Sequence, residues 1–350
     1  MRELDPTSEP MVQDALEFAS PLMRWFYASS YNRMVAQAPR VWGEVYRRSD
    51  VPFRGYRQRG RTRLTMALCR GFLAAAERLQ PDVILCTQFL PSEVFGTLRT
   101  QGSLKVPVYT AITDFSVHPI WVYPGMDRYF VATEDVRDEL AETGEIPPDR
   151  IDVTGVPIDP RFAVTIPAAE ARAALGLDPD PLRPTILLMG GGYGWGPIEG
   201  LLEVVLSLPG HVQALVIAGR NEELRTALAK RASGLEARIK VHGFTDRVDL
   251  FLSASDLIVG KAGGLTCSES MARGVPMAIF RPIPGQEERN CDYLQESGAA
   301  VRVHDFEDLH HRLSRFLTHP EALRSMREKA VAIGRPRSAY DVARAVMQHG

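Results

Sequence analysis

The 350-residue sequence lacks several features that would narrow its class. No apolar stretch approaches the ~20 residues that a membrane-spanning helix needs. The first residues, MRELDPTSEP, are acidic and contain proline, unlike the charged start and apolar segment of a signal peptide. The four cysteines, Cys69, Cys86, Cys267 and Cys291, show no paired metal-binding spacing. We therefore expect no membrane span and no secretion signal, and we expect isolated thiols in a reducing compartment.

The composition is that of an ordinary globular protein, with 45% apolar and 24% charged residues. The length favours two domains, each large enough to bury its own core. The best linker candidate is the proline-rich segment DPDPLRP at 178–184. It predicts a first domain over residues 1–178 and a second over 179–335, followed by a terminal helix over 336–350.

Short apolar runs alternate with helical patterns along the chain. In the first half they lie at 82–87, 106–113, 129–133 and 151–156, after a strand-like run at 14–19. In the second half they lie at 185–189, 214–218, 256–260 and 276–280. Near-continuous apolar runs suit buried parallel strands, and their alternation with helices predicts α/β domains.

The net charge of −2 conceals a basic region. Between Arg24 and Arg78 the sequence has twelve arginines against three acidic residues, interleaved with tryptophan and tyrosine. This mixture is expected on an anionic bilayer surface, but nucleic-acid binding uses similar residues, and a solvated basic helix is a third interpretation. The residues that would contact a membrane are Trp25, Trp42, Arg57, Arg59, Arg61 and Arg63.

The most informative stretch is DLIVGKAGGLTCSESMARGVPMAIFRPIPGQEERN, residues 256–290. It contains two strand-loop-helix units, and each strand leads through glycine or proline to a helix start at the carboxyl edge of a parallel sheet, where ligands of such sheets bind. The first amides of a helix lack partners and can hold an anion. Gly263, Gly264 and Thr266 are therefore candidate phosphate-binding residues.

Four polar residues near these helix starts are further candidates. Glu269 follows Thr266 by three residues, so it either completes a capping box or accepts hydrogen bonds from a ribose diol. Gln286, Glu287 and Asn290 open the second helix, either as partners of sugar hydroxyls or as a solvated first turn.

In the first half, TDFSVHPIW follows a strand end. Asp114 and His118 are candidates for acid-base chemistry or for binding an acceptor hydroxyl; the alternative is a turn-capping aspartate and a histidine held by backbone. Trp121 is expected to shape the acceptor entrance. The glycine-rich loop at 190–196 does not match a dinucleotide fingerprint, because the next strand ends in Gly219-Arg220-Asn221 and lacks the expected acid.

Several ordered motifs together carry a resemblance. KAGGLTCSES followed by PMAIFRPIPGQEERN, with LLMGGGYGWGP, VIAGRNEEL, VHGF, TDFSVHPIW and VTGVPIDPRF, resembles the family 28 glycosyltransferases that include monogalactosyldiacylglycerol synthases and the processive diacylglycerol beta-glucosyltransferases. The likeness extends over nearly the whole chain from about Asp14. More distantly, the sequence is similar to the lipid-linked N-acetylglucosaminyltransferase of peptidoglycan synthesis.

The resemblance implies a GT-B fold of two facing Rossmann-like domains, with the terminal helix crossing back to the first. It implies inverting transfer of galactose or glucose from UDP-galactose or UDP-glucose to diacylglycerol, on the inner face of the cell membrane and with no cofactor. No metal is expected, because no carboxylate pair of the Asp-x-Asp type lies near the predicted phosphate site. Because the resemblance implies a lipid acceptor, we expect the basic region to bind an anionic membrane surface and not nucleic acid. Expected donor-binding residues are Gly191, Gly192, Val241, Phe244, Gly263, Gly264, Thr266, Glu269, Gln286, Glu287 and Asn290.

One motif of these enzymes is missing. They begin with a strand and a GGGH loop whose histidine is the presumed base, and no GGGH occurs in this sequence. We expect either a start assigned too late or a chain that lacks this first strand and base. The alternatives are N-acetylglucosaminyl transfer to a polyprenyl-linked acceptor, or a chain that binds nucleotide sugar or lipid with impaired catalysis.

Overall fold

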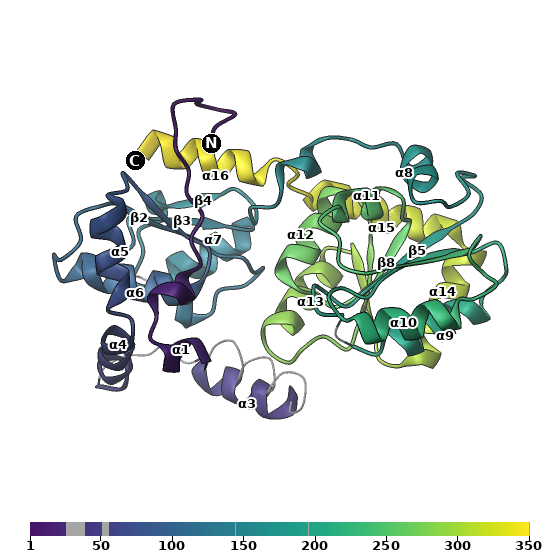
Figure 1. Cartoon of the computed structure of the whole chain (residues 1–350), viewed down its shortest axis with the longest axis horizontal. Helices are drawn as coiled ribbons and strands as arrows, with labels where there is room; N and C mark the ends of the chain where they lie inside the picture. Colours follow the sequence, from purple (N-terminus) through teal and green to yellow (C-terminus); the bar gives the residue numbers. More distant parts are fainter. Residues whose placement is uncertain (26–38, 51–55, 144, 195, 350) are drawn as a thin grey trace. The chain divides into compact units, whose positions relative to one another are not determined.

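The chain folds into two compact units. A computed structural model describes residues 1–25, 39–50, 56–143, 145–194 and 196–349. Residues 1–157 and 337–350 form unit 1, and residues 158–336 form unit 2. Both units have an α/β architecture with parallel strands, which confirms the predicted fold class (Figure 1).

The described strands of unit 1 form a parallel sheet in the order β1-β2-β3-β4. Within the described residues, β1 pairs with β2 alone, so it is an edge strand. The unit comprises η1 (Ala15–Phe18), α1 (Pro21–Trp25), α3 (Pro39–Ser49), α4 (Tyr56–Leu68), α5 (Gly71–Leu79), β1 (Ile84–Cys86), α6 (Phe89–Thr100), β2 (Val108–Ala111), η3 (Pro119–Trp121), β3 (Arg128–Val131), α7 (Glu134–Glu142), η4 (Pro148–Arg150), β4 (Ile151–Val153) and α16 (Ser338–His349).

The strand-like run at 14–19 is instead the short 3-10 helix η1. The Asp14 carboxylate accepts a hydrogen bond from the Leu16 amide, which stabilises a helical turn in place of an extended strand. The prediction of a strand here was therefore wrong.

The last helix, α16, completes the core of unit 1. Val342 and Val346 pack against Tyr109, Ala111 and Phe130 of β2 and β3. The Tyr109 hydroxyl also donates a hydrogen bond to the His349 carbonyl at 2.6 Å. The sheet of unit 1 therefore receives part of its cover from the far end of the chain.

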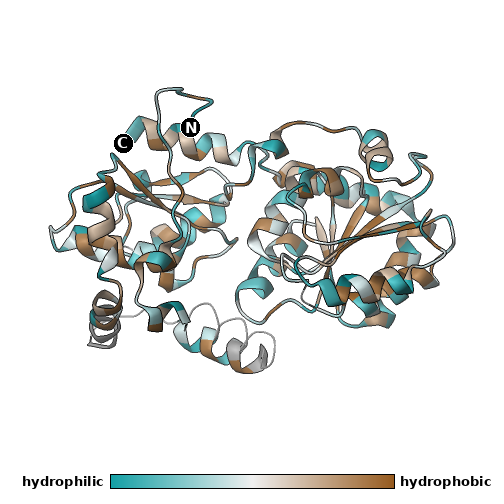
Figure 2. Ribbon diagram, in the orientation of Figure 1, coloured by the Kyte–Doolittle hydropathy of each residue, from teal (hydrophilic) through white to brown (hydrophobic). Residues whose placement is uncertain are grey.

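The strands of unit 2 form a six-stranded parallel sheet in the order β10-β9-β8-β5-β6-β7. Every residue of β5, β6, β8 and β9 is buried, and apart from the first residues of β5 and β6 these strands are almost wholly apolar, so they appear brown in the hydropathy view (Figure 2). The elements are η5 (Pro160–Ala163), α8 (Ala168–Ala174), β5 (Thr185–Met189), α9 (Ile198–Ser207), β6 (Gln213–Ile217), α10 (Glu222–Arg231), β7 (Ile239–His242), α11 (Val248–Ser253), β8 (Leu257–Gly260), α12 (Gly264–Ala272), β9 (Met277–Phe280), α13 (Gln286–Glu296), β10 (Ala300–Val303), α14 (Phe306–Thr318) and α15 (Pro320–Ile333).

The units divide after Pro157, earlier in the chain than the boundary expected at residue 178. The reason is that the segment before the proline-rich stretch packs on unit 2. The buried Arg172 of α8 contacts Asp256 through Nη2 at 2.7 Å and donates from Nε to the Ala254 carbonyl at 3.1 Å. A buried guanidinium satisfied in this way ties α8 to the edge of the sheet where β8 begins.

Among the helices that the structure describes, none is both long and apolar enough to cross a membrane.

The packing of α16 predicts a stability effect. Val346→Ala removes two buried methyl groups from the contact with β2 and β3, so we expect the free energy of unfolding to fall by about 1.5–3 kcal/mol. Urea denaturation measures this change. Met347→Ala, at a more exposed neighbouring position, is the control and should change stability by less than about 0.5 kcal/mol. Equal effects of the two substitutions would contradict the assigned packing of α16.

Candidate functional site

The order of strands in unit 2 creates a position for a ligand. β5 and β8 are neighbours in the sheet, and from this pair the chain proceeds outward through β6 and β7 on one side and through β9 and β10 on the other. At such a switch point the loops after the two central strands turn away from each other and leave a crevice at the carboxyl edge. The glycine-rich loop after β5 and the Lys261–Gly264 loop after β8 both lie at this point.

The loop after β5 presents open glycine backbone. Gly191, with φ of 72°, and Gly192 are both exposed, and a Cβ added to either would meet no atom within 4 Å. Two other glycines hold the loop in place. A Cβ at Gly194 would lie 2.1 Å from the Ala218 carbonyl oxygen, and one at Gly219 would lie 2.5 Å from that of Gly192. The loop is therefore packed tightly on the end of β6 and leaves its other side accessible.

The loop after β8 leads into α12 through glycine. The residue that caps α12 is Gly263, which has no side chain to bond the first amides, and the helix begins at Gly264. A Cβ at Gly263 would have only the Thr266 hydroxyl near it, at 4.0 Å. Gly263, Gly264 and Thr266 are thus brought together at an uncapped helix start, which suits anion binding.

Glu269 does not belong to a capping box. Thr266 is the third residue of α12 and not its cap, so Glu269 lies nearly one turn further along, beyond reach of the cap position. Within the described part of the chain its carboxylate has no hydrogen bond or ion pair. Burial, reinforced by the negative charges of Asp159 and Asp249, raises its pKa to about 7. A buried carboxyl group of this kind at a ligand-binding edge is a functional-site candidate.

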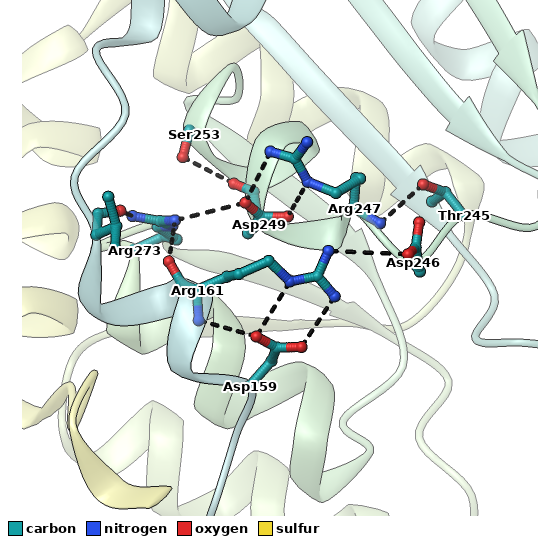
Figure 3. A network of polar contacts seen from close by, with 9 residues as sticks. Asp159, Arg161, Thr245, Asp246, Arg247, Asp249, Ser253 and Arg273 are labelled. Carbon is teal, nitrogen blue, oxygen red and sulfur yellow. Dashed lines mark hydrogen bonds and ion pairs between the residues drawn. The ribbon is translucent and has the colours of Figure 1, made fainter. Parts of the chain in front are cut away.

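The two carboxylates whose charges act on Glu269, Asp159 and Asp249, belong to a network of ion pairs (Figure 3). Arg161 holds Asp159 with Nε and Nη2 at 3.1 and 2.9 Å. Arg247 holds the buried Asp249 in the same two-point manner, at 3.0 and 3.2 Å. The two carboxylates that act on Glu269 are therefore fixed by guanidinium partners.

Arg273, from the end of α12, connects this network to the first segment of unit 2. It donates to the Arg161 carbonyl at 3.0 Å and to the Val164 carbonyl, and it lies 3.9 Å from Asp249 (Figure 3). Burial lowers the pKa of Arg273. The contacts join η5, α11 and α12.

The start of α13 is fixed by its own polar side chains. The Asn290 amide donates to the Ala262 carbonyl at 3.0 Å from a fully buried position. Glu287 accepts from the Ile283 amide at 2.8 Å, and Glu288 accepts from the Gly285 amide at 3.1 Å. Asn290 and Glu287 thus hold the loops after β8 and β9, and Gln286 lies half-buried at the first helical position.

Phe244 and Val241 occupy different environments at the end of β7. Phe244 follows the strand and is 55% exposed. Val241 lies inside β7 and packs on the core of unit 2, because its side chain points to the covered face of the sheet. Val241 can therefore contact a donor only through its backbone, whereas Phe244 offers an exposed ring at the carboxyl edge.

Arg220 joins two exposed aromatic rings at the same edge. Its guanidinium lies 4.4 Å from the Phe244 ring centroid and 5.9 Å from that of Tyr193. The Arg220 amide also donates to the Gly192 carbonyl at 2.9 Å. Loops after β5, β6 and β7 therefore meet through one cation-π cluster.

The candidates in unit 1 are buried. His118 accepts from the Ile120 amide at Nδ1 (3.1 Å), and a neutral ring that accepts there donates from Nε2, which lies 3.3 Å from the Ser49 hydroxyl. Asp114 is also buried. Protonation of His118 at Nδ1 would break the bond that caps η3, so the contacts match the alternative of a histidine held by backbone.

Trp121 does not line an accessible entrance. It is 5% exposed, and its ring packs edge-to-face with Phe89 at 6.1 Å. The short helix η3 turns the ring inward, so the expected contact with an acceptor or membrane was wrong for this residue.

The basic region presents some of the expected surface. Trp25 is 60% exposed at the end of α1, and Arg63 is exposed on α4. Exposed Val41 and Val45 share α3 with the exposed Arg47 and Arg48. The side chains of Trp42, Arg57, Arg59 and Arg61 lie outside the described part of the structure.

Two family models match the chain. That of monogalactosyldiacylglycerol (MGDG) synthase covers residues 2–158, and that of group 1 glycosyl transferases covers residues 182–332. A processive diacylglycerol beta-glucosyltransferase from Bacillus pumilus is 30% identical over 77% of this chain and 69% of its own length. The chain belongs to this glycosyltransferase family.

Relatives of the same name from Staphylococcus saprophyticus and Bacillus subtilis are each 32% identical, over 76% and 71% of this chain. The match covers 66% and 64% of their lengths, so this family member aligns with about two thirds of each relative.

Solved structures show the same fold at low identity. Acinetobacter baumannii MurG has a TM-score of 0.58 at 16% identity, over 81% of this chain and 78% of its own. The Staphylococcus aureus MnaA–UDP structure has a TM-score of 0.59 at 14% identity, over 82% and 80%. These likenesses place the chain among GT-B folds of two Rossmann-like domains.

Sequence reasoning missed two cations of the candidate donor edge. Lys261 and Arg220 each follow a strand of unit 2 directly or within three residues. The signal was present, because every strand of a parallel sheet ends at the same edge. In the part of the chain that the structure describes, no group of three histidine, cysteine, aspartate or glutamate side chains could hold a metal ion.

The raised pKa of Glu269 predicts a pH-dependent stability. Because the folded-state pKa (about 7) exceeds the usual value of 4.5, the stabilisation by the neutral form is complete below pH 4.5 and is lost as the pH rises through 7. Glu269→Gln keeps a neutral side chain, so we expect it to gain stability over the wild type by up to about 3 kcal/mol above pH 8 and little near pH 4.5. Urea denaturation across this range measures the difference; a difference that does not change with pH would contradict the assignment.

Proposed function

We propose that this protein transfers glucose or galactose from a UDP-sugar to diacylglycerol. Its family supplies the reaction class, since the named relatives are diacylglycerol beta-glucosyltransferases. The observation in this chain that carries the proposal is the position of two open glycine loops and an uncapped helix start at the β5/β8 switch point, with the buried Glu269 in the helix that begins there. That combination suits a nucleotide diphosphate with an attached ribose.

The strand order suggests how the donor lies along the sheet edge. Phe244 follows β7 at one end, the glycine loops follow β5 and β8 in the middle, and Gln286 follows β9 beyond them. We place the base at Phe244, the diphosphate at Gly191, Gly192, Gly263, Gly264 and Thr266, and the hexose at Gln286. Glu269 accepts hydrogen bonds from the ribose, and Glu287 and Asn290 keep the surrounding loops in place.

The donor site needs no metal in this proposal. The amides at the start of α12 and the positive end of its dipole face the diphosphate, and such groups neutralise charge that develops on a leaving phosphate. Nucleotide sugar binding is then insensitive to a chelator.

The acceptor side is assigned to unit 1 and to an anionic membrane, on the inner face of the cell membrane. Exposed Trp25, the apolar and basic faces of α3, and Arg63 support a peripheral contact with lipid headgroups. No nucleic acid is required.

A transfer assay tests the proposed reaction. The full chain, with UDP-glucose, UDP-galactose or UDP-N-acetylglucosamine, is offered diacylglycerol or a polyprenyl-linked acceptor, with and without EDTA. We expect hexosyl-diacylglycerol from one of the first two donors, unaffected by EDTA.

A binding measurement tests the role of Glu269. Glu269→Ala should weaken UDP binding roughly tenfold or more, because a charge-assisted hydrogen bond is lost. Glu223→Ala, at an exposed position, is the control and should leave UDP binding unchanged.

Three other results would change the proposal. Product only from UDP-N-acetylglucosamine and the polyprenyl acceptor would assign the alternative reaction. Tight UDP binding without transfer would identify a donor-binding chain with impaired catalysis. Unchanged UDP affinity in Glu269→Ala would remove the ribose role of Glu269.

Vesicle binding tests the membrane contact. Binding should increase with the fraction of anionic lipid and decrease with salt, since exposed charges are screened over ~8 Å at physiological ionic strength. Replacing Arg57, Arg59, Arg61 and Arg63 by glutamine should weaken binding more than tenfold, because each cation near the surface contributes ~1 kcal/mol. The control replaces the exposed Arg315, Arg324, Arg335 and Arg344. Equal binding to neutral vesicles would refute the electrostatic contact.

A further inference from the structure

Lys261 lies at the centre of the switch point. It is the first residue after β8, the strand that pairs directly with β5. Its Cε atom is 3.7 Å from the position that a Cβ on Gly196 would occupy, and Gly196 belongs to the loop after β5. The half-buried side chain therefore extends from one central loop to the other, at the point where the strand order reverses.

The surroundings of Lys261 suit an anion. The uncapped start of α12 follows two residues after it, with Gly263 open to approach. Glu287, from the next helix, is the acidic group that acts on the Lys261 ammonium; burial lowers the pKa of Lys261, and Glu287 opposes that shift. A partly desolvated cation binds a phosphate more strongly than one in bulk water, because less hydration must be removed on binding.

Arg220 is a further cation at this edge, and its position differs. It follows β6, one strand away from the switch point, is exposed, and is held against Phe244 and Tyr193. Its aromatic contacts associate it with the proposed base end of the donor. Lys261 is the cation that lies between the two glycine loops.

We propose that Lys261 binds the diphosphate of the donor and neutralises the charge that collects there when the sugar leaves. This proposal rests on the proposed function. As the acceptor hydroxyl oxygen bonds to the anomeric carbon and its proton passes to a general base or water, the bond from that carbon to the β-phosphate oxygen breaks. The electron pair stays on the phosphate, beside the ammonium group. Lys261 then supplies part of the stabilisation that metal-dependent glycosyl transfer obtains from a divalent cation.

Binding of three ligands that differ only in phosphate number tests this role. Calorimetry on the full chain compares uridine, UMP and UDP for the wild type, Lys261→Met and Lys261→Arg. We expect the wild type to bind UDP more tightly than uridine. Lys261→Met should lose about tenfold or more in UDP affinity and bind uridine as the wild type does, and Lys261→Arg should retain most of the UDP affinity.

Lys240→Met is the matched control. Lys240 is also half-buried in unit 2, but its ammonium lies beside Gly176, after α8. Lys240→Met should leave the affinities for uridine, UMP and UDP unchanged. Unaltered uridine binding by Lys261→Met shows that the site is folded, so the loss of UDP affinity then reports the phosphate contact.

The possible failures are distinguishable. If the wild type prefers UDP to uridine and Lys261→Met preserves that preference, the Lys261 role is overturned and the donor site stands. If Lys261→Met loses uridine and UDP affinity equally, Lys261 supports the loop and does not bind phosphate. If the wild type does not prefer UDP, the proposed donor and the Lys261 role are both wrong.

Discussion

The parallel pairing of β5 with β8 is the contact on which the donor edge depends. Because Met189 and Gly260 lie side by side in this pair, the loops that follow them begin next to each other. The chain then proceeds to opposite sides of the sheet, so neither loop covers the other. This topology places the glycines, Lys261 and the start of α12 at the same part of the sheet edge.

Side chains from the neighbouring elements then limit the freedom of these loops. Asn290 holds the Ala262 carbonyl from α13, and the Arg220 amide holds the Gly192 carbonyl from the end of β6. Glu269 differs from these residues, because its surroundings disfavour the carboxylate form, which is the form that would accept hydrogen bonds from a ribose diol. Such a residue reduces stability at neutral pH, and groups of this kind concentrate at functional sites.

The sequence predicted β1 to β4 of unit 1 and β5, β6, β8 and β9 of unit 2, because near-continuous apolar runs bounded by glycine and proline have few other interpretations, but it did not predict β10. It also predicted α13 from its first residue, Gln286. It failed where a local signal competed with packing. Thr266 resembled a helix cap, but Gly263 adopts the cap conformation and α12 starts earlier. Trp121 resembled a surface aromatic, and only the packing of η3 on Phe89 shows that it belongs to the core.

The unit boundary was misplaced for a similar reason. Prolines at 178–184 indicate a break in regular structure, yet the buried contact of Arg172 with Asp256, distant in sequence, decides to which core the preceding segment belongs. Burial and the negative charges of Asp159 and Asp249, which are distant in sequence, also determine the pKa of Glu269, and neither effect can be read from local composition.

The placement of α16 has a consequence for the order of folding. Tyr109 and His349 are 240 residues apart, and the intervening chain includes all of unit 2. During synthesis from the N-terminus, unit 2 can bury its sheet as soon as α15 has emerged, whereas unit 1 must wait for the final residues to cover Phe130. The sheet of unit 1 is therefore covered only after unit 2 has been made, and until then part of its apolar surface stays exposed.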